Sequence, residues 1–141
     1  MQTDAPGYSL IELLCVMAIV ATLAALAVPS GQALLRRVHR HEARLALLRI
    51  HAAQERRYAE QLRYATYLQS TGAEGLDLPL RSQYDRYDLQ LHTDTGGQHY
   101  SAEARPVPGS SQAQDLDCAL LWVDDLGRHG SQGAAERDCW R

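Results

Sequence analysis

A single carboxylate lies near the start of a long apolar segment. From Leu10 to Val28 the only polar side chains are those of Glu12 and Thr22. Because about 19 helical residues at roughly 1.5 Å each span on the order of 28 Å, the segment is long enough to cross a bilayer. An ionised group at the centre of such a segment costs roughly 2.5–3.5 kcal/mol, and less near an end, so we expect Glu12 to have a cationic partner.

The cysteines are the second group of residues whose types could do chemistry, because two of them could form a disulfide. Cys15 lies inside the apolar segment, where it reads as a small apolar residue facing lipid or a neighbouring helix. Cys118 and Cys139 are the only cysteines outside that segment. A bridge between them would stabilise the domain by about 3 kcal/mol in the chain-entropy model, and it requires an oxidising compartment. The alternative is two unpaired thiols.

Catalytic and metal-binding patterns are weak. The histidines lack metal-ligand spacing: His39 and His41, for example, are two residues apart and point to different helix faces. No serine stands in a nucleophile-elbow pattern. We therefore predict no catalytic residues, no metal site and no cofactor. An acidic turn exposed to solvent is the simpler interpretation of four carboxylates that could also bind calcium, which are Asp115, Asp117, Asp124 and Asp125.

The residues after the apolar segment have a helical period. Arginines alternate with apolar residues that recur at spacings of three, four or seven and predict one amphipathic stripe: Leu34, Val38, Leu45, Leu48, Ala52, Ala59 and Leu62. Pro29 and Gly31 interrupt this pattern, and proline removes a backbone donor, so a kink or a short melted segment is expected there. We predict one long interrupted helix from Tyr8 to about Thr66.

The remainder predicts a small antiparallel sheet. Residues 67–83 read as a loop. Two alternating segments, 87–91 and 100–104, flank a turn-rich stretch and predict a hairpin. A third strand is predicted at residues 118–123, and Asp124-Asp125-Leu126-Gly127 turns the chain into a last segment without a clear pattern. The expected class is α+β, a long N-terminal helix packed on this sheet.

Several ordinary explanations exist for the apolar segment. A removed secretory signal would have a basic start, and Ala25-Leu26-Ala27 could supply its cleavage site, but residues 1–7 contain Asp4 and no Lys or Arg. A lipoprotein cleavage before Cys15 would need a small residue where Leu14 stands. A plain single-pass anchor, with Glu12 reaching the interface, is the third explanation.

The segment Gly7-Tyr8-Ser9-Leu10-Ile11-Glu12-Leu13-Leu14, with Ala27-Val28-Pro29-Ser30 after it, resembles the class III signal of type IV pilins and type II secretion pseudopilins. The resemblance implies cleavage by the prepilin peptidase between Gly7 and Tyr8 and N-methylation of Tyr8. Glu12 would then be the fifth mature residue and would pair with the Tyr8 amine of a neighbouring subunit. Pro29 would be the twenty-second, the position of the helix kink.

The C-terminal part extends the resemblance. Cys118-Ala119-Leu120-Leu121-Trp122-Val123-Asp124, followed by Gly127 and Cys139-Trp140, is similar to PilE-like minor pilins. This implies the type IV pilin fold with a disulfide-bounded C-terminal loop. It also implies a leader at residues 1–7, a transmembrane and assembly helix at 8–31, and a periplasmic globular domain at 32–141.

The function implied by this resemblance is structural, not enzymatic. A minor pilin is stored in the bacterial inner membrane with most of the chain in the periplasm, and is then incorporated into a type IV pilus or primes its assembly. It supports pilus biogenesis, twitching motility and adhesion. Its partners are other major and minor pilins, the prepilin peptidase and the inner-membrane assembly machinery. The alternatives are a type II secretion pseudopilin and a DNA-receptor minor pilin for natural transformation.

Charge is unevenly divided along the chain. From Leu34 to Ala65 eight arginines face three glutamates, whereas Thr66 to Arg141 carries six arginines and twelve acids. A basic helix can mark nucleic-acid binding, but here we expect the arginines to pair with acidic groups on the domain or on neighbouring subunits. The basic residues Arg36 and Arg37 follow the apolar segment, so the charge rule argues against the orientation that the motif implies.

Overall fold

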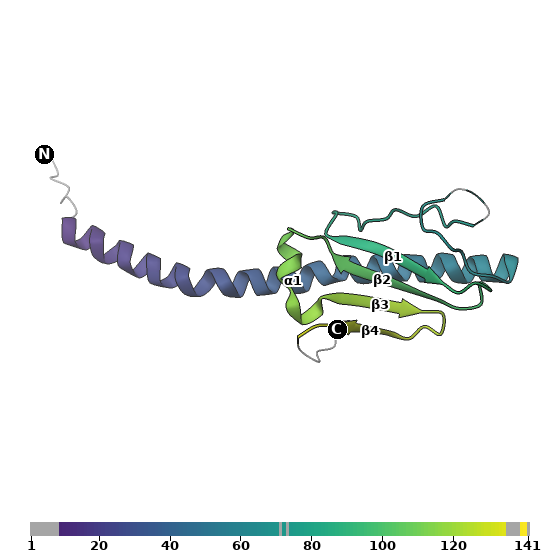
Figure 1. The fold of residues 1–141 in the computed structure, drawn as a ribbon. Coiled ribbons are helices and arrows are strands. Elements are labelled where there is room, and N and C mark those ends of the chain that lie inside the picture. The colour runs from purple at the N-terminus through teal and green to yellow at the C-terminus, as the bar shows by residue number, and fades with distance from the viewer. Residues whose placement is uncertain (1–8, 71, 73, 135–138, 141) are drawn as a thin grey trace, which may run out of the picture. The chain divides into compact units, whose positions relative to one another are not determined.

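The described residues form one long helix, four strands and two short 3-10 turns (Figure 1). The computed structural model describes residues 9–134, except 71 and 73, and residues 139–140, with no side-chain description at 28–30. Residues 1–35 and residues 36–141 form two separate compact units. The elements are α1 (Leu10–Gln61), β1 (Tyr87–Thr93), β2 (Tyr100–Pro106), η1 (Ser111–Gln114), η2 (Leu116–Cys118), β3 (Leu120–Asp124) and β4 (His129–Gln132).

Helix α1 is unbroken through Pro29, so the expectation of a melted segment there is wrong. The kink at Pro29 stays a prediction. The helix ends at Gln61 instead of near Thr66, because Leu62 adopts a left-handed backbone with φ of 54°. The buried Gln54 then binds the departing chain, since its Oε1 accepts from the Ala65 N–H at 2.8 Å and its Nε2 donates to the Ala65 carbonyl at 3.1 Å.

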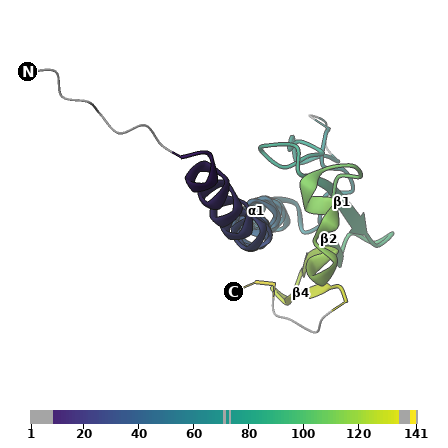
Figure 2. The same cartoon turned by 90° about the vertical axis from the view of Figure 1, so that its left-hand side faces the viewer.

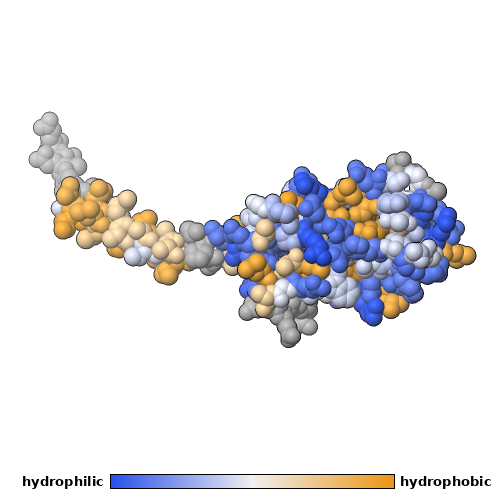
Figure 3. Space-filling view, in the orientation of Figure 1, coloured by the Kyte–Doolittle hydropathy of each residue, from blue (hydrophilic) through white to orange (hydrophobic). Residues whose placement is uncertain are grey.

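The face of the first half of α1 that Figure 3 shows is mostly apolar. Among the described residues α1 is the one helix long and apolar enough to cross a membrane. Its large apolar side chains from Leu10 to Leu26 are 52–79 % exposed. Since an exposed apolar surface of this extent is unstable in water, lipid or other helices must cover it.

The sheet is antiparallel with strand order β1-β2-β3-β4. The predicted hairpin is confirmed, with Leu89 opposite Ala104 and Leu91 opposite Ala102. The third strand begins at Leu120, because Cys118 lies in η2 and not in a strand. The sequence did not predict β4, whose His-Gly-Ser-Gln residues carry no apolar alternation. It forms by pairing with β3, where only glycine fits at position 130, since a Cβ there would come within 2.9 Å of the Trp122 ring.

The core lies between α1 and one face of the sheet. The helix contributes Ala43, Leu47 and Ile50, each at most 1 % exposed. The predicted stripe is therefore on the wrong face: Val38, Leu45 and Leu48 are 54 %, 56 % and 49 % exposed. The rest of the core comes from residues beyond the helix, which are Tyr64, Leu68, Tyr87, Leu89, Tyr100, Ala102, Ala104, Cys118, Leu121, Val123 and Cys139.

A disulfide joins Cys118 to Cys139, with both residues fully buried, so the predicted bridge is present. It fixes the C-terminal residues beside η2. Trp140 adds two further contacts, since its Nε1 donates to the Gly130 carbonyl at 2.8 Å and its carbonyl accepts from Arg44. The end of the chain is thereby attached to β4 and to α1 as well as to η2.

Candidate functional site

The predicted assembly site lies at the start of α1. Glu12 is in the first helical turn and is exposed, in the position where a carboxylate complements the partial positive charge of a helix N-terminus. Gly7 and Tyr8 lie outside the described residues. The first basic residue after Glu12 in the sequence is Arg36. The described part of α1 thus leaves the Glu12 carboxylate available to a cation from another molecule.

A buried ion pair attaches the connection between β2 and β3 to α1. Arg40 holds Asp115 in a bidentate contact, with Nε to Oδ2 and Nη2 to Oδ1 both 2.7 Å. Gln112 donates to the same Oδ2 at 2.8 Å, and the Asp115 side chain is only 3 % exposed. The hydrogen bond to Asp115 raises the pKa of Arg40. The expectation that helix arginines pair with acids on the domain is confirmed for Arg40.

A second ion pair joins α1 to the segment before β1. Glu42 accepts from Arg86 Nη1 at 2.8 Å and from the Tyr84 backbone N–H at 2.8 Å. Burial opposes ionisation of this carboxyl, but hydrogen bonds from Ser82, Arg86 and Tyr84 outweigh burial and lower the pKa of Glu42. Arg40 and Glu42 are two residues apart on α1. One helical turn therefore positions both the β2–β3 connection and the segment before β1.

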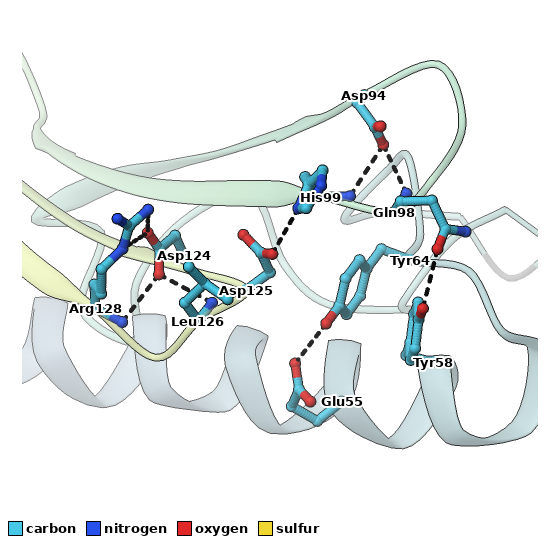
Figure 4. A network of polar contacts seen from close by, with 10 residues as sticks. All are labelled: Glu55, Tyr58, Tyr64, Asp94, Gln98, His99, Asp124, Asp125, Leu126 and Arg128. Carbon is cyan, nitrogen blue, oxygen red and sulfur yellow. Dashed lines mark hydrogen bonds and ion pairs between the residues drawn. The ribbon is translucent and has the colours of Figure 1, made fainter.

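Polar contacts also organise the β1–β2 and β3–β4 turns, which lie at the end of the sheet opposite to the β2–β3 connection (Figure 4). In the β1–β2 turn Asp94 Oδ1 accepts from the backbone N–H groups of Gln98 and His99. In the β3–β4 turn Asp124 binds the Arg128 side chain at 2.7 Å and accepts from the backbone of Leu126 and Arg128. Of the four carboxylates that the sequence offered for calcium, Asp124 is used in this turn, and Asp115 is bound by Arg40 and Gln112. Among the described residues no three His, Cys, Asp or Glu side chains gather as metal ligands.

His99 links the two turns. Its Nδ1 lies 2.8 Å from Asp125 Oδ2, and this hydrogen bond raises the pKa of the exposed His99 imidazole. An open groove of about 430 Å³ lies beside this pair. It is lined by His92, Thr93, Asp94, His99, Tyr100, Ser101, Asp124, Asp125 and Arg128.

The raised pKa makes the contribution of His99 depend on pH. It stabilises the fold fully below the unfolded value of about 6.5, and the contribution is lost as pH rises through the folded pKa. We expect His99→Gln to lower the thermal midpoint at pH 5.5 and to leave it unchanged at pH 9, as measured by circular dichroism on the full chain in detergent. His92→Gln, in the same groove, is the control. An equal loss at both pH values would contradict the ion pair.

The exposed arginines of the domain differ in their partners. On the sheet side Arg81, Arg105 and Arg128 each contact a carboxylate, although their side chains are 53 %, 52 % and 68 % exposed. On α1 the exposed Arg49 and Arg56 have no carboxylate partner among the described residues. The helix therefore presents unneutralised positive charge, whereas the sheet face presents paired charge.

Comparison with known proteins agrees with this architecture. Residues 29–122 match the family model described as type IV minor pilin ComP, DNA uptake sequence receptor, and residues 5–28 match the prokaryotic N-terminal methylation motif. A type IV pilin from Shewanella oneidensis has the same fold, with 18 % identity and a TM-score of 0.53 over 75 % of this chain and 98 % of that chain. No curated protein matches the sequence. Because the first of these models covers more than half of the chain, the protein belongs to the type IV minor pilin family, whose members are structural subunits and not enzymes.

Proposed function

We propose that this chain is a minor subunit of a type IV pilus, cut between Gly7 and Tyr8, methylated on Tyr8 and incorporated through α1. The observation that carries the proposal is the order of the two matches, a methylation motif over residues 5–28 directly followed by a minor pilin model over 29–122. In this role residues 1–7 are the leader, residues 8–31 anchor the chain in the inner membrane, and residues 32–141 form the periplasmic domain. The subunit then supports pilus biogenesis, twitching motility and adhesion.

The exposed apolar first half of α1 supports the same role. A segment that is apolar on every side can be covered first by lipid and later by the helices of other pilins without a change of its own structure. Glu12 then neutralises the Tyr8 amine of a neighbouring subunit, because both charges enter an apolar environment and each needs the other. The partners are other pilins, the prepilin peptidase and the inner-membrane assembly machinery.

Processing provides the direct test. Because a small residue is needed before the cleaved bond, Gly7→Leu should block cleavage and leave the uncut chain in the membrane. The measurement is the intact mass of the chain purified from its own cells, which for the unchanged protein should begin at methylated Tyr8. Gly31→Leu is the matched control, since Gly31 is exposed and a Cβ atom there would meet nothing within 4 Å. A mature chain that begins anywhere other than Tyr8 would overturn the proposal.

A second candidate function is DNA reception, which the description of the matching family model favours. The outer face of the sheet is where this chain could contact a phosphate backbone. Arg81 and Arg105 lie there together, because Arg81 binds Asp88 and Asp88 stands opposite Arg105 across β1 and β2. Both guanidinium groups are half exposed and have further N–H donors for a phosphate.

The DNA candidate predicts a change in salt dependence. Arg81→Gln/Arg105→Gln should weaken binding of the full chain to duplex DNA and should reduce the slope of log affinity against log salt by about 0.9 for each phosphate that is no longer neutralised. Fluorescence anisotropy at several salt concentrations measures both quantities. Arg49→Gln/Arg56→Gln on α1 removes the same charge from arginines that have no carboxylate partner among the described residues, so a reduced slope for this variant alone would place the DNA contact on the helix instead. Equal slopes for the unchanged protein and both variants would remove the sheet face as a DNA site.

A further inference from the structure

The face of α1 that points away from the sheet is largely exposed in the domain formed by residues 36–141. At one edge of this face Val38, Leu45 and Arg49 line a groove with residues of the segment before β1. The four strands lie on one side of the helix (Figure 2). The opposite side, here called the outward face, consists of exposed residues at spacings of three, four or seven, which are Val38, Leu45, Leu48, Arg49, Ala52, Arg56, Ala59 and Glu60. About half of each large apolar side chain on this face is accessible. A surface of this kind is covered by a partner in a stable assembly.

The outward face has two chemically distinct halves. Toward the start of the domain it is apolar, with Val38, Leu45 and Leu48. Toward the end of the helix it is basic, because Arg49 and Arg56 lie seven residues apart on the same side. Small alanines at 52 and 59 separate the charges and allow another helix to approach closely.

These two arginines lack compensation within their own domain. Neither forms an ion pair with a described carboxylate, in contrast to Arg40 on the covered side. Of the nearby helix acids, Glu55 accepts a hydrogen bond from Tyr64. Glu60 is the one carboxylate on the outward face itself. Covering this face with an apolar surface would bury guanidinium groups without partners, which is strongly unfavourable.

A second copy of this chain that contacted this face with its own outward face would be a poor partner because of its charge. It would present the same two arginines against one glutamate, so like charges would meet across the contact. A helix from another pilin that carries two carboxylates about seven residues apart would instead place them roughly 10.5 Å apart, which matches the spacing of Arg49 and Arg56. Bidentate contacts between guanidinium and carboxylate would then compensate both charges.

We infer that the outward face of α1 binds a helix of a different pilin, one that presents carboxylates to Arg49 and Arg56 and apolar side chains to Val38, Leu45 and Leu48. This inference rests on the proposed role as a pilus subunit, and it names the chemistry of the neighbour. Each copy is thereby placed among acidic subunits and kept apart from other copies.

Site-specific photocrosslinking identifies the neighbour. Ala52→benzoylphenylalanine places the probe between the two arginines in the full chain in its own cells, and mass spectrometry of the adduct identifies the partner peptide. The expected adduct is with another pilin that has Asp or Glu within about one helical turn of the crosslinked residue. An adduct with a second copy of this chain, or with a helix that lacks carboxylates there, overturns the inference.

Charge reversal tests whether Arg49 and Arg56 stabilise the contact with the neighbouring pilin. Arg49→Glu/Arg56→Glu should reduce the amount of this chain in sheared pili by about tenfold, whereas Arg81→Glu/Arg105→Glu on the sheet face, with the same change in charge, should not reduce it. The thermal midpoint of each variant shows that the domain is still folded. Unchanged incorporation of Arg49→Glu/Arg56→Glu would overturn this inference but not the proposed function. Absence of the unchanged chain from pili, with its leader uncut, overturns the proposed function as well.

Discussion

Arg40→Met should destabilise the domain by about 3–5 kcal/mol, because it leaves a carboxylate buried without its cation. Asp115 is almost completely inaccessible, and the hydrogen bond from Gln112 alone does not replace the charge of the guanidinium group. The whole stability of a small domain is about 5–15 kcal/mol, so the effect is large. Chemical unfolding of the full chain in detergent, followed by circular dichroism, measures it.

Two matched variants make this result specific. Arg40→Met/Asp115→Leu removes both charges and should recover much of the stability, since no unpaired charge remains. Arg105→Met breaks an exposed pair with Glu103 and should change the free energy of unfolding by less than about 1 kcal/mol. If Arg40→Met were no more harmful than Arg105→Met, the Arg40–Asp115 contact would not fix the β2–β3 connection on α1.

Removing the bridge between Cys118 and Cys139 should destabilise the domain by about 2–5 kcal/mol, in part because the unfolded chain gains freedom when the loop opens. The change to test is Cys118→Ala/Cys139→Ala. A lower thermal midpoint and faster proteolysis of the C-terminal residues are expected, because the hydrogen bonds of Trp140 with Gly130 and Arg44 depend on the position that the bridge gives to residue 139.

Cys15→Ser is the control for removal of the bridge, since Cys15 is a free exposed cysteine in the other unit of the chain. Its unfolding transition should match that of the unchanged protein. Peptide mapping of the oxidised chain should find Cys118 joined to Cys139. Alkylation of both residues without prior reduction, in protein taken from the periplasm, would show that the bridge does not form in the cell.

Several elements follow from local sequence alone. The apolar segment from residue 10 is recognisable because its length matches a bilayer and its composition excludes a soluble surface helix. The β1–β2 hairpin is recognisable because alternating apolar residues flank a turn-rich stretch. Each of these signals depends on neighbours within about ten residues, so no knowledge of the fold is needed to read it. The cysteine pair could be predicted because only two cysteines lie outside the apolar segment.

The packed face of α1 was decided by tertiary structure. The sequence offers two apolar faces on the helix, and the one with more large residues at regular spacing is the exposed one. The covered face contains Ala43, Leu47 and Ile50 but also the polar Gln54 and Arg57, which weakens its periodic signal. Small and polar residues suit that side because the sheet and the loop after the helix supply their contacts, such as Ala65 for Gln54.

Strand pairs and ion pairs between residues far apart in the sequence could not be predicted either. Strand β4 has no strand-forming pattern of its own and exists because β3 offers a free edge with Trp122 opposite Gly130. Arg40 and Asp115 are 75 residues apart, and nothing in either neighbourhood marks them as partners. The sequence by itself determined the membrane-spanning length, the hairpin and the cysteine pair, because short-range periodicity and composition specify them. Tertiary structure decided which helix face is covered and which charges are compensated, because burial and electrostatic pairing depend on residues that only folding brings together.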